Sequence, residues 1–507
     1  MKDRKSRRKP APKVPAFVSC KGWSLDTLVA KSKNFHKVHR VRWSKSTAEQ
    51  IKEYDAANRG KPLIVEGLHE HPKWITAEFT PEWLLEHSGS QEISARNVHD
   101  RTDKALLLSD FIKNARATSH FVTPGEKERL YGKDVPCPSE WKKFLHTGAV
   151  IPASLAPDGP DNVLNNLPKA DRPETLMCYL GIGDTFTPYL CASYGHNLMT
   201  YTENGGSSFW FMTETSSANA AAEFFHSVLE QELDHESHVV LLDELAKAPF
   251  NVYIAEQKLG DLILVPPRSA HQVVNSGGLT IKTSWSRMTV DSLTLALRYE
   301  LPLYRRVCRI ETYRVKSTIY HTLRRVIRQG KRNRDGRESP AGSPNVNAKE
   351  MASILDTLLR LFDSTLKEEY TQEHKDIPTL SEVDKEDDCD IGQLACNFCG
   401  CDLFQSFFEC TTCVKAVGQK RVARGAGFNI CPGCYAEGRS CHCEVMSPVQ
   451  CRSPADLLKT RKQGIALLAQ LKGGKSGLGL PSEKYVWLRS SLPPIHRLQG
   501  SCWQTAG

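Results

Sequence analysis

The sequence lacks several features that would assign it to a class at once. No run of apolar residues approaches the roughly 18 that a membrane-spanning helix needs. The leading residues MKDRKSRRKPAPK are basic and polar with no apolar segment behind them, unlike a secretory signal. There is no GxSxG nucleophile elbow and no P-loop, so an α/β-hydrolase or a P-loop nucleotidase is not indicated. We therefore expect a soluble, intracellular protein with no membrane partner.

The composition is that of a globular protein. Its 507 residues are 40% hydrophobic and 25% charged, which is enough for two or three domains with a sizeable core. The net charge is +9, and basic residues gather at the N-terminus and in RRVIRQGKRNRDGR, residues 324–337. Such clusters suit nuclear import or contact with nucleic-acid phosphates, and a solvated surface is the alternative. We expect the protein in the nucleus.

Cysteine is abundant in one segment only. Eleven of the 17 cysteines lie between Cys389 and Cys451. In a reducing compartment such a cluster indicates metal binding rather than disulfides. A span of about 60 residues builds little core, so a bound metal should hold this segment together.

Four pairs of cysteines in this segment have the spacing of zinc ligands. A Cys-x2-Cys turn presents two thiolates to one ion, and four ligands complete a tetrahedron. We expect two zinc ions, with an iron–sulfur centre as the alternative; Cys389, Cys401 and Cys451 remain as spare ligands. An interleaved cross-brace assigns Cys396, Cys399, Cys431 and Cys434 to one ion, and Cys410, Cys413, Cys441 and Cys443 to the other.

Periodicity and turn residues divide the rest of the chain. Between residues 176 and 290, short apolar strands are separated by Gly, Pro and Asn, a pattern typical of a barrel or a double-sheet jelly roll. Helical periodicity flanks these strands on both sides. We predict an α+β chain with these parts: a basic disordered lead (1–45), the strand-rich domain (46–290), a helical extension (291–330), a linker with one amphipathic helix (331–388), a Cys-rich zinc-binding domain (389–452) and a tail (453–507).

The segment GDLILVPPRSAHQVVNSGG, residues 260–278, resembles the distal-histidine segment of the JmjC family of Fe(II)/2-oxoglutarate oxygenases. GKPLIVEG, LYGKDVPCPSEWKKFL, FTP and SSFWFMT follow the family's other segments in the same order. The similarity covers residues 46–290, and with the Cys-rich part the chain looks most like fungal JmjC proteins related to histone lysine demethylases. The resemblance implies a double-stranded β-helix, cupin-like, with flanking helices and a small zinc-stabilised domain after it.

The resemblance also implies an iron site, and half of that site is missing. The family holds iron with a His-x-Asp/Glu pair and one distal His, which leaves three positions for 2-oxoglutarate and oxygen. His271 matches the distal His. After Thr187-Pro188, however, FTPY runs directly into LCASYGHNLM, without the pair. Asp184, Cys191 and His196 lie nearby but form no such pair, so Fe(II) should be held weakly or not at all.

The positions that would bind 2-oxoglutarate are partly kept. Thr187 and Asn197 align with residues of the family that contact this cofactor. A lysine that binds its distal carboxylate is replaced by Ser208, and Lys282 on a later strand could serve instead. Each of these residues could equally be an ordinary hydrogen-bonding or solvated strand residue.

Two functions of different classes follow from the resemblance. The family implies a dioxygenase that removes methyl groups from histone lysines or hydroxylates proteins, whereas the missing pair favours a non-catalytic chromatin protein that binds histone tails or other chromatin proteins. Whether the chain is an enzyme stays open. A third reading is that a segment encoding His-x-Asp lies in the gene between Pro188 and Tyr189 and is absent only from this splice form or gene model.

Overall fold

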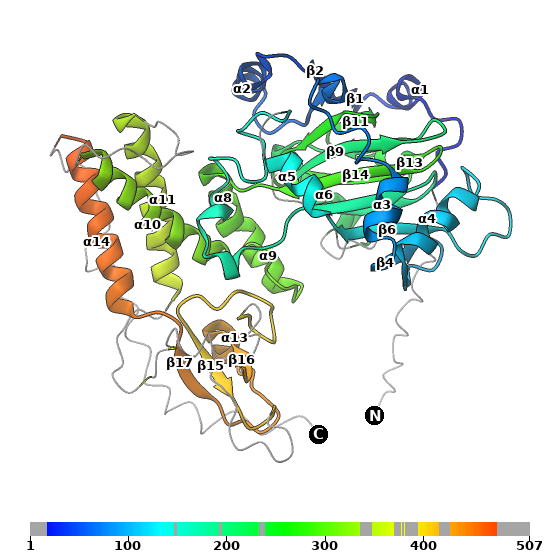
Figure 1. The fold of residues 1–507 in the computed structure, drawn as a ribbon. Coiled ribbons are helices and arrows are strands. Elements are labelled where there is room, and N and C mark those ends of the chain that lie inside the picture. The colour runs from blue at the N-terminus through cyan, green and yellow to red at the C-terminus, as the bar shows by residue number, and fades with distance from the viewer. Residues whose placement is uncertain are drawn as a thin grey trace. The chain divides into compact units, whose positions relative to one another are not determined.

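The computed structural model describes residues 18–146, 150–191, 195–231, 233, 239–334, 347–369, 377, 380, 394–414 and 426–473. The chain divides into two compact units (Figure 1). The barrel unit comprises residues 1–162 and 173–292, and the helix–cysteine unit comprises residues 163–172 and 293–507. Among the described residues, no helix combines the length and the apolar character that a bilayer requires.

Two β-sheets form the centre of the barrel unit. The smaller sheet has five strands, in the order β1(Phe35–Lys37), β11(Val252–Gln257), β10(Ser207–Met212), β13(Ala270–Ser276) and β8(Phe186–Cys191). The larger sheet has nine strands, in the order β2(His39–Arg42), β3(Leu63–Glu66), β12(Leu262–Val265), β9(Gly195–Thr202), β14(Thr280–Ser286), β7(Met177–Gly181), β6(Leu130–Pro136), β4(Glu92–Asn97) and β5(Asp103–Leu107). From β7 to β14 the chain passes repeatedly between the sheets, which confirms the predicted jelly roll.

Helices flank these sheets, as Figure 1 shows. They are α1(Leu25–Val29), α2(Thr47–Ala57), α3(Pro81–Ser88), α4(Leu108–Ala117), α5(Ser139–His146), α6(Ala218–Ser227) and α7(Leu242–Leu245), with short 3-10 turns η1(Leu68–Glu70) and η4(Thr215–Ser217). Helix α8(Val290–Leu295) spans the boundary between the units. The start of α3 follows from its sequence, because the Thr80 side chain accepts a hydrogen bond from Trp83 N and Pro81 needs no donor in the first turn.

Strands β11, β10 and β13 of the smaller sheet bury side chains on both faces. In β10, Phe209 packs with Phe224 of α6, whereas Trp210 and Met212 face the larger sheet and pack with Ile263. This is the alternation that a strand imposes, with successive side chains on opposite faces. The space between the two sheets is therefore lined by every second residue of each strand.

Two stretches of the chain are more ordered than the predicted boundaries imply. Residues 25–42, assigned from the sequence to a disordered lead, contain α1, β1 and β2, and Phe35 pairs with Val252 in a parallel register. Residues 454–471, assigned to a featureless tail, form a helix. The rest of the lead (1–17), most of the tail (474–507) and parts of the predicted linker lie outside the described residues.

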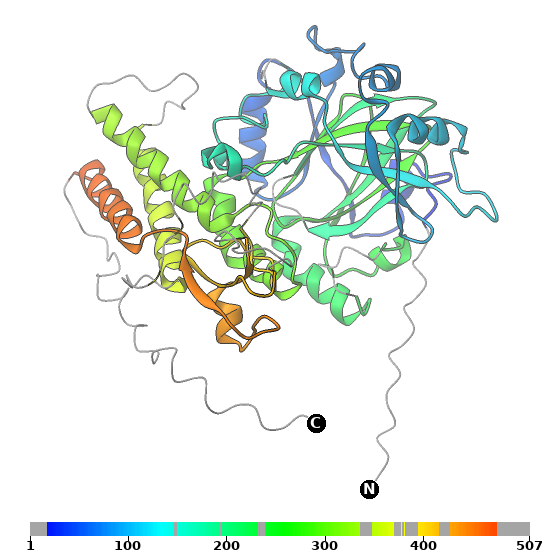
Figure 2. The same ribbon diagram turned by 60° about the horizontal axis from the view of Figure 1, so that its bottom comes forward.

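The helix–cysteine unit combines a helical bundle with a small sheet (Figure 2). Its helices are α9(Leu301–Arg306), α10(Val315–Arg334), α11(Ala348–Glu368), α13(Pro432–Ala436) and α14(Pro454–Leu471), with short turns η2(Val163–Asn166), η3(Lys169–Asp171) and η6(Ala296–Glu300). Helices α10, α11 and α14 pack against one another. The sheet has the order β16(Phe428–Ile430), β15(Ser406–Cys410) and β17(Ser447–Gln450).

Candidate functional site

Polar residues line the space between the two sheets of the barrel unit. Strands β10 and β13 are antiparallel neighbours, with Ser208 beside Asn275 and Met212 beside His271. Trp210 and Met212 face the larger sheet, so Ser208 shares their face of β10. The same alternation places His271 and Asn275 on the inner face of β13. The predicted iron position and a cluster of polar residues therefore lie along one inner surface.

His271 is buried and neutral. Its side chain stacks on Trp210 with ring centroids 5.8 Å apart, and its Nδ1 lies 3.3 Å from the carbonyl oxygen of Ser269. Burial lowers the pKa of His271 to about 4. A neutral imidazole is the form that binds metals, so His271 suits the ligand position that the resemblance assigned to it.

The other residues near the expected iron position do not complete a ligand set. Asp184 is held elsewhere, because its carboxylate accepts hydrogen bonds from Cys20 N at 2.7 Å and Val122 N at 2.9 Å. His196 stacks on Trp285, which belongs to the hydrophobic core on the face of the larger sheet that points away from the smaller sheet. The side chain of Cys191 lies outside the described residues. Among described residues, no group of three or more metal-binding side chains includes His271, so the described side chains do not supply a ligand set for ferrous ion.

Lys282 occupies the interior near the place where the family's lysine would lie. It is 1% exposed, and from the larger sheet its Nζ donates to Ser208 Oγ at 2.9 Å and to Asn275 Oδ1 on the opposite sheet. Burial lowers the pKa of Lys282 to about 7, and no charged neighbour offsets this. A buried ammonium whose partners are neutral is a binding position for an anion. The amine of Lys282 thus lies beside Ser208, the position at which the resemblance places the family's lysine.

Thr187 and Asn197 belong to two different hydrogen-bonded groups. Thr187 Oγ1 lies 3.3 Å from the hydroxyl of Tyr131, which is buried and whose pKa is raised by burial. Asn197 Oδ1 accepts from Gln257 Nε2 at 3.1 Å, and Gln257 Oε1 accepts from Trp210 Nε1 at 2.8 Å. Asn197 is thereby linked to the ring on which the distal histidine stacks.

Sequence reasoning missed Tyr131, Gln257 and Asn275 as residues of this surface. Asn275 could have been found from strand periodicity, since it lies four residues after His271 and shares its face. Tyr131 could not, because β6 lies in the other sheet and its contact with Thr187 depends on how the sheets face each other.

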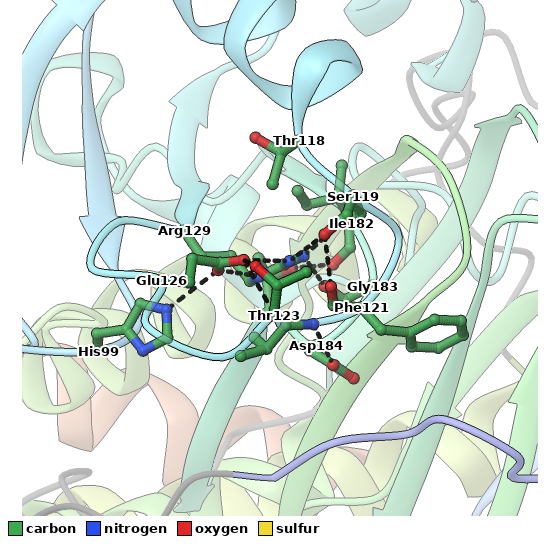
Figure 3. Close-up of polar contacts among 12 residues, drawn as sticks. His99, Thr118, Ser119, Phe121, Thr123, Glu126, Arg129, Ile182, Gly183 and Asp184 are labelled. Carbon is green, nitrogen blue, oxygen red and sulfur yellow. Dashed lines mark hydrogen bonds and ion pairs between the residues drawn. The ribbon is translucent and has the colours of Figure 1, made fainter.

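A buried ionic network positions the start of β8, as Figure 3 shows. The side chain of Arg129 is fully buried and donates to the carbonyl oxygens of Gly183 at 2.6 Å and Ser119 at 3.0 Å. Glu126 binds Arg129 Nε at 2.7 Å and His99 Nε2 at 3.1 Å. Asp184 follows with a positive φ of 64°. Hydrogen bonds to Gly183 and Asp184 thus fix the turn that precedes Thr187.

Comparison with known proteins agrees with this geometry. Residues 177–286 match the family model described as "JmjC domain, hydroxylase". These residues form a JmjC domain. The chain is also 28% identical over 442 residues to C-module-binding factor A of Dictyostelium discoideum. The matched region covers 83% of this chain and 42% of the relative. The chain thus spans less than half the length of the curated relative that it matches.

The cysteines that follow the JmjC domain form two groups of four. Within each group the sulfur atoms lie within 4.8 Å of one another, so each group could hold a metal ion. The grouping is the one that an interleaved cross-brace requires: Cys396, Cys399, Cys431 and Cys434 in one group, and Cys410, Cys413, Cys441 and Cys443 in the other. Of the spare cysteines, Cys401 is buried beside the first group, where its side chain interacts with those of Cys396, Cys399 and Cys431. Cys451 is also buried, and Cys389 lies outside the described residues.

Backbone amides support the sulfurs of these groups. Cys399 N donates to Cys396 Sγ at 3.5 Å, and Cys434 N donates to Cys431 Sγ at 3.4 Å. Such donors favour the thiolate over the thiol, and the thiolate is the form that binds zinc. The chemistry of both groups therefore fits structural zinc sites.

The first cysteine group is attached to the segment that precedes α10. Glu311 N donates to the carbonyl oxygen of Gly400 at 2.8 Å, and Glu311 Oε2 accepts from Asp402 N at 2.9 Å. The other carboxylate oxygen of Glu311 accepts from Val315 N at 2.7 Å. Gly400 has a φ of 74°, and an added Cβ would lie 2.4 Å from the carbonyl oxygen of Arg309. Glycine is therefore required at this contact.

Proposed function

We propose that this chain is a chromatin-associated JmjC protein, related to histone lysine demethylases, that binds 2-oxoglutarate without turning it over. One observation carries the proposal: among the described residues, the buried amine of Lys282 is bonded only to neutral side chains, whereas His271 is accompanied by no second iron ligand. These features support binding of the cofactor and speak against binding of the metal.

The proposed cofactor is held by residues of both sheets. Lys282, with Ser208 beside it, would bind one carboxylate of 2-oxoglutarate through a charge-assisted hydrogen bond. Thr187 and Asn197 would contribute further hydrogen bonds. In an active member of the family, 2-oxoglutarate supplies the two electrons that, together with Fe(II), activate oxygen. In this chain the remaining function is binding.

The proposed partners are histone tails or other chromatin proteins, in the nucleus. The JmjC domain supports this at the level of the family. The relative's name, C-module-binding factor A, supports a role in which a target is bound. We propose that two zinc ions hold the Cys-rich segment and that the segment braces the helices or docks peptides.

Metal content and turnover test the proposed loss of activity. The purified chain should contain about two zinc ions and negligible iron, and it should form no succinate from 2-oxoglutarate after incubation with Fe(II). Stoichiometric iron together with succinate formation would reject the proposal. Inserting His-Lys-Asp before Leu190 should restore iron binding if the rest of the site is competent.

Ligand binding tests the proposed cofactor role separately. We expect 2-oxoglutarate to raise the melting temperature of the parent chain. Lys282→Met should abolish this shift, whereas Lys247→Met, at an exposed lysine of the same unit, should leave it unchanged. Equal shifts in all three proteins would show that the ligand does not bind at Lys282.

The second candidate is an active histone lysine demethylase or protein hydroxylase. The retained Lys282 position favours it, because a lost activity does not by itself preserve a costly buried ammonium. This candidate requires a transcript that encodes His-x-Asp between Pro188 and Tyr189. Sequencing the transcript across this junction decides the matter, and an uninterrupted read excludes the candidate.

A further inference from the structure

Helix α10 is basic throughout and buries only one side. Its 20 residues, VKSTIYHTLRRVIRQGKRNR, include no Asp and no Glu. Ile319, Leu323 and Ile327 are buried, on the side where α10 packs against α11 and α14. The apolar face of the helix is thus already covered within its own unit.

Four cations gather on the opposite side of α10. Arg324, Arg328, Lys331 and Arg332 are exposed, and we call them the cationic stripe. At 3.6 residues per turn they fall within an arc of about 100°, and at 1.5 Å per residue they span about 12 Å. The helix therefore presents them as one row on a rigid support.

The cationic stripe has no anionic partner within the described residues. Its one recorded contact is that of Arg324, which lies over the ring of Tyr320 at 5.4 Å. Other cations of α10 are engaged: Lys316 binds Glu369 at 2.7 Å, and Arg325 donates to Asn166 at 2.7 Å. Among the described residues, the lack of anionic partners is thus a property of this exposed row, which leaves its charge available to an outside anion.

His321 lies in the same positive field. Its pKa is lowered to about 4, mainly by burial and in smaller part by the nearby guanidinium groups of Arg452, Arg324 and Arg328, against an opposing effect of Asp171.

We propose that the cationic stripe binds the phosphate backbone of double-stranded DNA without reading its base sequence. Duplex DNA carries one charge for about every 1.7 Å of its axis, so a row of about 12 Å can meet several phosphates at once. Three of the four cations are arginines, whose planar guanidinium groups bind phosphate through two parallel hydrogen bonds. Phosphate contacts of this kind position a protein and carry no sequence information. This proposal does not depend on the JmjC site.

A membrane surface is a poorer match. A helix that lies in a membrane interface inserts an apolar face next to its basic one. The exposed large apolar residues of the described chain lie outside α10, whose apolar face is buried. Charge alone would also attract an acidic peptide, which the experiment below includes as a competitor.

Fluorescence anisotropy with the full chain tests the proposal. The probes are two labelled 20-base-pair duplexes of unrelated sequence. The stripe variant changes all four cations to Gln. A matched control removes the same charge at exposed lysines elsewhere, as Lys113→Gln, Lys247→Gln, Lys349→Gln and Lys459→Gln. Circular dichroism and zinc content check that both variants fold.

We expect the parent and the control to bind both duplexes with similar affinity, and the stripe variant to bind at least tenfold more weakly. For the parent, log K should fall with log salt, and the slope of the stripe variant should be smaller by about 3 to 4, because each phosphate contact contributes about 0.9. An unchanged affinity or slope in the stripe variant would overturn the proposal. So would preferential binding of the parent to phosphatidylserine vesicles or to a poly-glutamate peptide over DNA.

Discussion

Replacing Lys282 by Met should stabilise the barrel unit when no ligand is bound. Met has a similar length and carries no charge, so it fills the same space between the sheets. The ammonium that it removes is 1% exposed and bound only to the neutral side chains of Ser208 and Asn275. These two side chains also bond to each other at 2.8 Å and keep that bond in the variant.

The size of the effect follows from the protonation equilibrium. Burial lowers the pKa of Lys282 from 10.5 to about 7. Each factor of ten in this equilibrium corresponds to about 1.4 kcal/mol, which sets an upper limit of about 5 kcal/mol on the cost of the buried charge. The variant loses two hydrogen bonds of about 1 kcal/mol each. We therefore expect a net gain of about 1 to 3 kcal/mol in the free energy of unfolding at pH 6.5.

The gain depends on pH in a defined direction. Between pH 7 and 10.5 the unfolded chain keeps the proton of Lys282 while the folded chain releases it. The unfolded state therefore binds more protons, and the stability of the parent rises with pH across this window. The Met variant lacks this contribution, so the difference between the two proteins is largest below pH 7 and shrinks toward pH 10.5.

Urea unfolding at pH 6.5 and 9 measures the difference. Tryptophan fluorescence reports the barrel unit, because seven of the nine tryptophans belong to it. Lys247→Met, at an exposed lysine, should change the stability by less than about 0.5 kcal/mol. A Lys282→Met protein that is less stable than the parent at pH 6.5, or a gap that is the same at both pH values, would refute the reasoning.

Three further outcomes are expected in the helix–cysteine unit. Cys410→Ser should leave about one zinc ion per chain by elemental analysis, because the other group of four is intact. Gly400→Ala should cost about 2 to 4 kcal/mol in chemical unfolding, since its φ is 74° and the new Cβ would lie 2.4 Å from the carbonyl oxygen of Arg309. Asp363→Ala should lower the free energy of unfolding by about 3 to 5 kcal/mol, because it leaves the buried guanidinium of Arg461 without its carboxylate.

Each of these substitutions has a matched control in the same unit. Cys308→Ser changes an exposed cysteine outside both groups and should keep two zinc ions. Gly438→Ala has a similar φ of 83° with open space around it, so it should cost only about 1 to 2 kcal/mol. Asp356→Ala removes the partner of the exposed Arg360 and should cost less than about 1 kcal/mol. If a control lost as much zinc, or as much free energy of unfolding, as its test variant, the corresponding mechanism would be contradicted.

The strands after residue 176 were predictable because their apolar runs are bounded by Gly, Pro and Asn. Most runs expected from the sequence correspond to one strand, for example SSFWFMT to β10, whereas the run LCASYGHNLMTY falls across the end of β8 and the start of β9. The two edge strands near the N-terminus were not predictable. β2 has the sequence HRVR, and β1 pairs in parallel with residues more than 200 positions away. Charged side chains at a sheet edge look like a solvated segment when the partner strand is unknown.

Residues of the candidate site were predictable one by one, but their partners were not. Lys282 was identified from its strand, yet its contact with Ser208 joins opposite sheets and has no signature in the sequence. The grouping of the cysteines was proposed from spacing alone, and the structure brings together the same two sets of four. Local spacing constrains a cysteine cluster because both ends of each turn face one point, whereas the packing of two sheets depends on the whole domain.

The contact between Glu311 and Gly400 ties the segment before α10 to the cysteine loop that Cys396 and Cys399 form. If zinc shapes this loop, a chain made under zinc starvation would lack the partner of that segment and expose it to proteases. Its cellular lifetime would then follow zinc supply. The same dependence would make limited proteolysis near residue 314 a sensitive report of whether the ion has been delivered.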